Sequence, residues 1–233
     1  MMTLYSADLS PFAARVRMQI YAKGITDIAM VMPPGFGTPK YREANPIGRI
    51  PVLDIDGDLM PESEVIAEYI EELYPEPSML GATPRETAHI RTLARLSDIY
   101  LLNNLFMLAS QVPAATRSQG AVDLLAGQVT RNVAALDRMI GQGGFACYGR
   151  LTMADCALVP ALFLLGGTLP AVGVDNPVPA HANVAAYDAA IRRNEHAARV
   201  LDELQRGLKE RLEMMRSGEF ARRMAEAQGA AGA

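Results

Sequence analysis

A carboxylate and a hydroxyl stand side by side at Glu62-Ser63, in the segment MPESEVIAEYIEELYP. The apolar spacing predicts a helix over residues 62–74, which places both side chains at its first turn. Exposed N–H groups and a hydroxyl at a helix start bind a carboxylate, and a neighbouring glutamate can hold an ammonium group. Together they can bind the zwitterionic end of an amino acid. A plain capping motif, with acidic residues well placed in the helix dipole, is the alternative.

Two other short segments also allow both a ligand-binding and a purely structural interpretation. Ser10-Pro11, in LYSADLSPFAARVRM, places a bare hydroxyl at the start of a helix just beyond a strand, although Ser-Pro is also a common helix cap. In GRIPVL, Ile50 precedes Pro51 and is pushed towards extended geometry. If this bond is cis, the backbone of Ile50 turns outward and can pair with an extended peptide. An ordinary trans proline at a strand start is the alternative.

The composition of the 233-residue chain limits the classes of function. Half of its residues are hydrophobic, which suffices for one large domain or two small ones, and the net charge of −4 gives no footprint for nucleic acid. We find no secretory signal and no run of about 18 apolar residues that would span a bilayer, so we expect a cytoplasmic protein without a membrane partner. Two cysteines and three scattered histidines match no metal-ligand spacing, so no metal is expected.

The first 80 residues alternate between strand and helix patterns. We expect strands over residues 3–5, 27–32 and 50–56, an edge strand over 57–60, and helices over 10–23 and 62–74. One apolar face of the second helix carries Val65, Ile66, Tyr69, Ile70 and Leu73. Asp56-Gly57-Asp58 predicts a hairpin turn, and residues 35–48 a loop with an irregular helical turn. The order βαβ, then ββα, implies a parallel strand pair with a right-handed crossover.

Residues 74–86 interrupt this alternation with three prolines and a glycine. They end in Thr83-Pro84-Arg85-Glu86, a capping box with proline at the first helical position. Beyond it we find only helical patterns, over residues 84–112, 119–141, 152–167, 181–192 and 195–226, with AQGAAGA as an unstructured end. We therefore predict an α/β domain over residues 1–76, a linker over 77–86 and an all-helical domain over 87–233.

In this arrangement the sequence resembles the cytosolic glutathione transferase family, in its serine-type, bacterial-like form. A further match is YGRLTMADCALVPAL, where Thr152 and Asp155 fill the S/T-x-x-D positions of the family's buried N-capping box. The resemblance covers essentially the whole chain. It implies a thioredoxin-like N-terminal domain, ordered β-α-β-α-β-β-α, followed by an all-α domain.

The resemblance also assigns roles to the segments above. Ser10 would donate a hydrogen bond to the sulfur of glutathione and favour its thiolate, aided by the helix N-terminus, with Ser6 as the competing hydroxyl. Ile50 would pair its backbone with the cysteinyl part of glutathione, and a cis Pro51 would fix that geometry.

Other residues would hold the two ends of glutathione. Glu62 and Ser63 would bind the γ-glutamyl end, and Arg49 the glycyl carboxylate, with Lys40 as a weaker partner. Asp98 would reach the glutathione amino group across a dimer interface, since a homodimer is expected from the family.

The electrophile is expected between the two domains, where clefts favour ligands. Its far wall would come from the first long helix after the linker, and core packing is the alternative for each candidate. The candidates are Phe12, Tyr100, Asn103, Asn104, Phe106 and Met107. Residues 208–228 would pack as a solvated helix through Leu208, Leu212 and Met215, or would cap the site.

The chain departs from some relatives, because it reads Ser-Pro-Phe-Ala from Ser10. It has neither a C-x-x-C motif nor the Ser-Ser-Cys run of the zeta-type isomerases, so thiol–disulfide exchange is not expected. We interpret Cys156 as a small buried hydrophobe. Cys147, beside two glycines, is expected to be more exposed.

We therefore predict a glutathione transferase of the detoxification type, with glutathione as co-substrate and a small hydrophobic electrophile as second substrate. A glutathione-dependent lyase, dehalogenase or isomerase on the same scaffold is one alternative. A non-catalytic binding module with this fold is the other.

Overall fold

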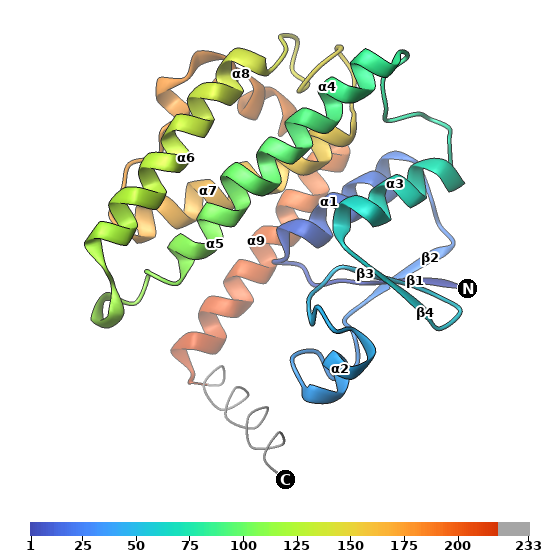
Figure 1. Ribbon diagram of the computed structural model, residues 1–233, viewed down its shortest axis with the longest axis horizontal. Helices are drawn as coiled ribbons and strands as arrows, with labels where there is room; N and C mark the ends of the chain where they lie inside the picture. Colours follow the sequence, from blue (N-terminus) through green and yellow to red (C-terminus); the bar gives the residue numbers. More distant parts are fainter. Residues whose placement is uncertain (219–233) are drawn as a thin grey trace. The chain divides into compact units, whose positions relative to one another are not determined.

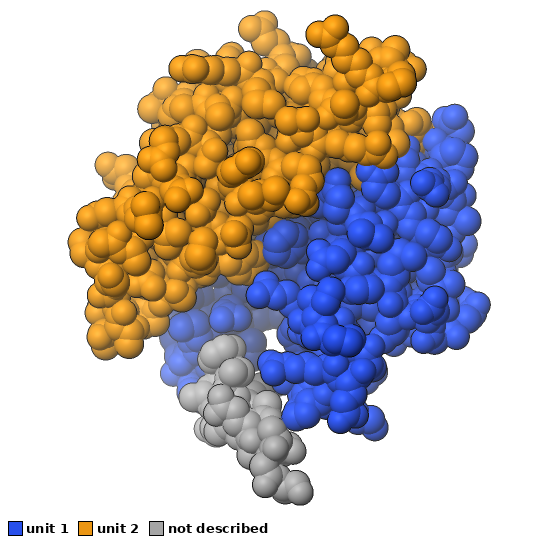
Figure 2. All heavy atoms as spheres, viewed as in Figure 1, with its two compact units in different colours: residues 1–76, 202–233 blue, residues 77–201 orange. Residues whose placement is uncertain are grey.

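The computed structural model describes residues 1–218 of the chain, which fall into two compact units. Unit 1 comprises Met1–Glu76 and the chain from Asp202, and unit 2 comprises Pro77–Leu201 (Figure 2). The first break lies where the sequence predicts the end of the α/β domain. The chain from Asp202, which we expected in the helical domain, groups with unit 1 because its side chains pair with residues near the N-terminus.

Unit 1 is built on a four-stranded sheet with the strand order β2-β1-β3-β4. Strands β1 and β2 are parallel, and β3 is antiparallel to both β1 and β4. Helices α1 and α3 lie on one side of the sheet and α2 on the other (Figure 1). The elements are β1 (Met2–Tyr5), α1 (Pro11–Ala22), β2 (Ile28–Val31), α2 (Pro39–Ala44), β3 (Val52–Ile55), β4 (Asp58–Pro61) and α3 (Ser63–Leu73). The predicted thioredoxin-like order is confirmed, and the expected irregular turn is the short helix α2.

Local signals fix where these elements begin and end. Ser10 is the N-cap of α1, and its Oγ accepts a hydrogen bond from the backbone N–H of Ala13 at 3.2 Å. Gly24 follows the helix at φ +65°, a backbone conformation that costs glycine little. At the hairpin between β3 and β4, Asp56 and Gly57 both have positive φ, as a tight two-residue turn requires.

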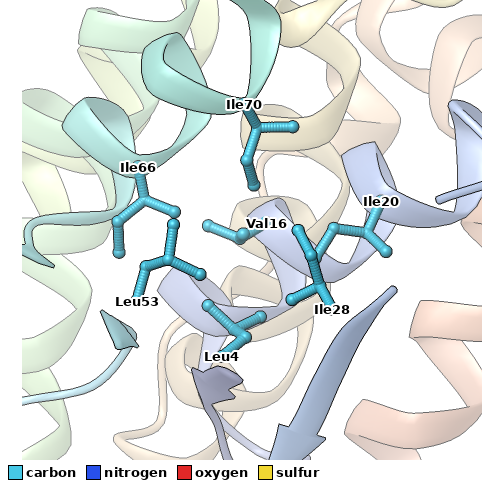
Figure 3. Close-up of a cluster of buried hydrophobic side chains, with 7 residues drawn as sticks. All are labelled: Leu4, Val16, Ile20, Ile28, Leu53, Ile66 and Ile70. Atoms are coloured by element: carbon cyan, nitrogen blue, oxygen red, sulfur yellow. The ribbon is translucent and has the colours of Figure 1, made fainter. Parts of the chain in front are cut away.

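The core of unit 1 lies between the sheet and the two helices α1 and α3 (Figure 3). Burial of aliphatic side chains from the sheet and from both helices holds α1 and α3 against the strands. The cluster consists of Leu4, Val16, Ile20, Ile28, Leu53, Ile66 and Ile70. The predicted apolar face of α3 is only partly buried, because Val65 and Leu73 are exposed at the sides of the helix.

Unit 2 is helical, as predicted. Its helices are α4 (Pro84–Arg95), α5 (Asn103–Ala109), α6 (Gln119–Met139), α7 (Met153–Ala171) and α8 (Ala182–Ile191), with short 3-10 turns η2 (Ala114–Thr116) and η3 (Val178–Ala180). Helix α9 (Glu195–Arg216) starts in unit 2 and continues into unit 1. The expected continuous helix over residues 84–112 is interrupted by a π-helical segment, η1 (Leu96–Leu102). There Ser97 donates a hydrogen bond to the carbonyl of Ala157, in the turn of α7 before Pro160.

Helix α7 corrects one expectation from the sequence. This helix of 19 residues is long enough and apolar enough to cross a membrane, judged by length and composition alone. The sequence had led us to expect no apolar run of that length. In the structure 72% of its most apolar window is buried, which is typical of a core helix. The predicted capping box at its start is present, with the Asp155 carboxylate accepting from the N–H of Thr152 at 2.8 Å and of Ala146 at 2.7 Å.

The buried face of α9 differs from the predicted one. Leu212 and Met215 are exposed, whereas Glu203, Leu204 and Gly207 are buried. The last part of the predicted helix, over residues 219–226, and the predicted unstructured end lie outside the described residues.

Candidate functional site

The register of the sheet in unit 1 brings the three candidate segments to one edge. Tyr5 pairs with Val52, and Val52 pairs with Pro61, so these residues form one row across β1, β3 and β4. Neighbouring strands lie about 4.8 Å apart, so the row is about 10 Å long. Ile50-Pro51 directly precedes this row, and Glu62-Ser63 directly follows it. The loop of residues 6–9 leads from it to Ser10.

The hydroxyl of Ser10 acts as an acceptor in the helix cap and can still donate its proton to a second group. It is half-buried, and its oxygen accepts from the Ala13 N–H as a helix cap. A hydroxyl oxygen that accepts this bond keeps its own proton for donation to a second group. Capping and donation to a bound sulfur are therefore compatible in Ser10. The capping interaction also fixes the hydroxyl at the positive end of α1.

Ser6, the competing hydroxyl, lies in a buried polar network. It is 7% exposed, and its Oγ accepts a hydrogen bond from Nη1 of Arg17 at 2.6 Å. Its backbone N–H pairs with the carbonyl of Val31 at 2.8 Å, which ties the residue to the sheet. These contacts give Ser6 a structural role in the loop that leads to Ser10.

The peptide bond between Ile50 and Pro51 is cis, as predicted. Within residues 1–218, neither the N–H nor the C=O of Ile50 pairs with another backbone group. The preceding carbonyl of Arg49 accepts from the Tyr41 hydroxyl at 3.0 Å and from Nδ2 of Asn45 at 2.8 Å. Helix α2 and the residue after it therefore hold the approach to β3. The pairing of the Ile50 backbone with a ligand stays a prediction.

Glu62 and Ser63 stand at the first turn of α3, as the spacing predicts. Glu62 is exposed and takes φ +76°. A non-glycine residue in this region costs about 1–3 kcal/mol and is found mostly at functional sites. Ser63 is 6% exposed. Glu64, on the same turn, forms an ion pair at 2.5 Å with the buried Arg15 of α1, which ties the two helix starts together.

The two predicted cations of the glutathione site are on the surface of unit 1. Lys40 lies in α2 and Arg49 immediately before Ile50, and both side chains are exposed. Neither forms an ion pair with any other residue of the described chain. Their roles towards a carboxylate stay predictions.

The remaining predicted residues lie in unit 2, except Phe12, which is half-buried in α1 of unit 1. Four electrophile-site candidates form one exposed face of η1 and α5: Tyr100, Asn103, Phe106 and Met107. Asn104 is buried and donates to the carbonyl of Tyr100 at 2.8 Å, so it has a structural role. Asp98 is half-buried in η1, with Arg95 at 3.8 Å. The roles of these residues towards ligands stay predictions.

One groove of unit 2, with a volume of about 710 Å³, lies along α4, η1 and α6. Of the predicted site residues it includes only Tyr100. Its lining residues are Pro84, Ala88, Arg91, Thr92, Arg95, Leu96, Ile99, Tyr100, Asn132, Ala135 and Met139.

Both thiols are buried. Cys147, expected to be exposed, is 2% exposed, because the loop after the two glycines folds against the start of α7. Burial raises the pKa of its thiol to about 11, so it is protonated at neutral pH. Cys156 is 1% exposed. In the part of the chain that the structure describes, no group of three His, Cys, Asp or Glu side chains is placed to hold a metal ion.

The residues that hold the loop before Ser10 were not among those predicted from the sequence. Arg17 is 3% exposed and bonds to three residues of this loop and to Glu203 of α9. The available signal was a cation inside the apolar stretch FAARVRMQI, since a buried arginine needs several acceptors. The acceptor 186 residues away gave no local signal.

Comparison with known proteins agrees with the resemblance. A glutathione S-transferase N-terminal domain model matches residues 4–78, and a glutathione S-transferase C-terminal domain model matches residues 119–187. A glutathione S-transferase from Methylobacterium radiotolerans, solved in complex with glutathione sulfonate, has a TM-score of 0.74 and 22% identity, covering 86% of this chain and 94% of its own. This likeness shows that the fold is shared.

Two proteins that are similar to this chain in sequence have names that differ from each other. Maleylacetoacetate isomerase from Pseudomonas aeruginosa is 33% identical over 171 residues, which are 70% of this chain and 80% of the relative. A stringent starvation protein A homolog from Coxiella burnetii is 26% identical over 210 residues, which are 90% of this chain and 95% of the relative. With both domain models matched in order and a one-third identical relative covered over most of its length, the chain belongs to the glutathione S-transferase family.

Proposed function

We propose that this protein is a glutathione-dependent enzyme in which the Ser10 hydroxyl stabilises the glutathione thiolate for attack on a small electrophile. The observation that carries the proposal is the row of Tyr5, Val52 and Pro61, which places all three candidate segments at one edge of the sheet. Each segment offers a group suited to one part of a γ-glutamyl tripeptide. Family membership supports the same ligand.

The chemistry follows from these groups. The backbone of Ile50 pairs with the cysteinyl unit, and the α3 N-terminus with Ser63 and Glu62 binds the amino-acid end of the γ-glutamyl residue. This anchoring directs the sulfur towards Ser10. A hydrogen bond to an ionised acceptor contributes about 1.5–3 kcal/mol, which lowers a thiol pKa by about one to two units. Orientation of the thiolate against the electrophile supplies the rest of the rate enhancement.

Calorimetric titration with reduced glutathione tests this proposal. We expect saturable binding that Glu62→Ala and Ser63→Ala each weaken about tenfold, as loss of one charged hydrogen bond predicts. Glu72→Ala is the matched control, because it removes an exposed carboxylate from the other end of α3. Absence of binding by the native protein at millimolar glutathione would leave a non-catalytic binding module as the better account. The relation to the stringent starvation protein A homolog would then carry more weight.

A second candidate, glutathione-dependent cis–trans isomerisation, is favoured by the relation to maleylacetoacetate isomerase. The thiolate would add to one carbon of a conjugated cis double bond, leaving a single bond about which the adduct rotates. Elimination of the thiolate then restores the double bond in the trans form and returns glutathione. This remains the second candidate because Pro11 and Phe12 follow Ser10, where a Ser-Ser-Cys run would be expected.

A count of free thiols separates the two candidates. Incubation with a maleyl-type enone should yield trans product at constant thiol concentration if the protein is an isomerase. Conjugation of an activated aryl halide consumes one thiol for each product formed. The candidate whose substrate is turned over with the expected thiol balance is retained.

A further inference from the structure

The loop of residues 6–9, which leads from β1 to Ser10, is held mainly by one side chain. Arg17 donates from Nη1 to Oγ of Ser6 at 2.6 Å and to the carbonyl of Ala7 at 2.9 Å, and from Nη2 to the carbonyl of Asp8 at 3.0 Å. The loop's own backbone adds a bond from the Ser10 N–H to the Ala7 carbonyl at 3.1 Å. The guanidinium thus fixes three consecutive residues just before the proposed catalytic hydroxyl.

Arg17 is well placed for this because it belongs to the helix that Ser10 caps. Residues seven positions apart lie on the same helix face, so the side chain of Arg17 extends back along α1 towards its start. It is 3% exposed and presents its planar donor fork to several acceptors at once. A lysine has one compact ammonium group, which cannot reach all of these acceptors.

The middle of α9, which belongs to unit 1 from Asp202 onward, completes the arrangement. Glu203 accepts from Nε of Arg17 at 2.7 Å and from the Tyr21 hydroxyl at 2.7 Å, so both carboxylate oxygens are used. Arg206 pairs with the Asp8 carboxylate at 2.7 Å. We name Arg17, Glu203 and Arg206 the loop clamp.

Gly207 shows how closely α9 approaches the loop. A Cβ atom at this position would lie 2.6 Å from the backbone nitrogen of Leu9, closer than packed atoms allow. Glu203, Arg206 and Gly207 lie at i, i+3 and i+4 and therefore share one helix face. That face meets the loop directly.

We propose that Arg17 and Glu203 are positioning residues that fix the loop of residues 6–9 and thereby aim the Ser10 hydroxyl at the glutathione sulfur; this inference rests on the proposed function. Burying an ion pair gives little net stability compared with apolar residues of the same size. The effect of the Arg17–Glu203 pair on geometry is larger than its effect on stability. The hydrogen bonds from the guanidinium to the carbonyls of Ala7 and Asp8 select one loop conformation. A misplacement of about 1 Å is enough to lower turnover strongly.

Two substitutions disturb the loop clamp in different ways. Arg17→Lys keeps the charge beside Glu203 and loses the fork. Gly207→Ala keeps the ion pair, crowds the loop at Leu9 and improves helix propensity by about 1 kcal/mol, so the helix itself is not weakened. The matched control is Glu71→Gln, which removes the carboxylate of another buried ion pair in unit 1, at 2.8 Å from Lys23, without touching the loop.

The readouts are the apparent pKa of bound glutathione, from the ultraviolet absorbance of its thiolate, and kcat, with the glutathione Kd and the unfolding temperature measured alongside. For Arg17→Lys and Gly207→Ala we expect the thiol pKa to rise by about one unit and kcat to fall about tenfold, with Kd within about twofold. Glu71→Gln should lower only the unfolding temperature. Amide exchange at residues 6–10 should become faster in Arg17→Lys even without glutathione.

The outcomes separate this inference from the proposed function. Glutathione binding by the native protein, with unchanged thiol pKa, kcat and loop exchange in both variants, would overturn the positioning role alone. Equal effects of Glu71→Gln on the thiol pKa and kcat would also overturn it. A native protein that binds no glutathione would overturn the proposed function, and the catalytic part of this inference with it.

Discussion

The Nε atom of Arg17 lies 2.7 Å from Oε2 of Glu203, although 186 residues separate them in the chain. The same guanidinium bonds to Ser6, Ala7 and Asp8, so the last described helix is connected through one side chain to the loop before Ser10. This connection explains why the chain from Asp202 groups with the N-terminal sheet. The loop of residues 6–9 and the middle of α9 are thus joined within unit 1.

Replacement of Ser10 by alanine should lower turnover far more than glutathione affinity. The variant loses the donor to the sulfur and keeps the anchoring groups at Ile50, Glu62 and Ser63. A thiol pKa that rises by about one to two units lowers the thiolate fraction near neutral pH by about 10- to 100-fold, and we expect kcat to fall by a similar factor. Steady-state kinetics with an activated aryl halide and a calorimetric glutathione Kd would measure the two effects.

Ser6→Ala is the matched control for that experiment, since it removes a hydroxyl four residues earlier. The variant leaves Nη1 of Arg17 with the Ala7 carbonyl as an acceptor. We therefore expect a smaller loss of turnover than in Ser10→Ala, and a decrease of about 1 kcal/mol in the free energy of unfolding. A larger loss of turnover in Ser6→Ala than in Ser10→Ala would exchange the roles of the two serines.

The thiols of the native protein should react slowly with thiol reagents. Burial raises the pKa of Cys147 to about 11, and Cys156 is equally inaccessible in the core helix α7. Both should be labelled at the rate of unfolding, and Cys147→Ala should keep glutathione-dependent turnover within about twofold. Rapid stoichiometric labelling of the folded protein at neutral pH would contradict this expectation.

The capping carboxylate of Asp155 should make stability depend on pH. Its burial raises its pKa from 3.8 to about 6, although hydrogen bonds from Ala146 and Thr152 act in the opposite direction. A carboxyl whose pKa is raised on folding binds its proton more tightly in the folded state. Its contribution to stability is therefore fully present below the unfolded pKa and is lost as pH rises from about 4 to about 6.

Asp155→Asn isolates this contribution, because the amide does not titrate. The two-unit shift corresponds to about 3 kcal/mol. Denaturant unfolding gives the free energy of unfolding of both proteins at each pH. We expect the native value minus the Asp155→Asn value to fall by about 3 kcal/mol between pH 4 and pH 7. The loss of the cap itself shifts this difference equally at every pH. A gap between the two proteins that widens over this range would show that the pKa of Asp155 is lowered on folding.

Local signals were enough to predict most of unit 1. Ser10-Pro11 and Asp56-Gly57 mark their helix start and turn by backbone preferences that do not depend on distant residues. The spacing of apolar residues over 62–74 predicted a helix with Ile66 and Ile70 on its apolar face, and both are in the core. These features depend on side chains within a few positions of each other in the sequence.

Features that depend on long-range packing could not be predicted in this way. The π-helical segment η1 interrupts a stretch whose spacing is compatible with a continuous helix, and its Ser97 bonds to Ala157, 60 residues away. Cys147 follows two glycines, which usually mark exposed turns, yet its loop folds against α7. Val65 belongs to the predicted apolar face of α3 but is exposed, because burial depends on the orientation of the helix as well as on its apolar residues.

The pKa of the thiol of bound glutathione tests the central claim most directly. It can be obtained from the thiolate absorbance across a pH titration of the native protein and of Ser10→Ala, each saturated with glutathione. The account predicts a thiol pKa at least about one unit below that of free glutathione in the native protein, and a return towards the free value in Ser10→Ala. An equally lowered thiol pKa in both proteins, or a native value equal to that of free glutathione, would contradict it.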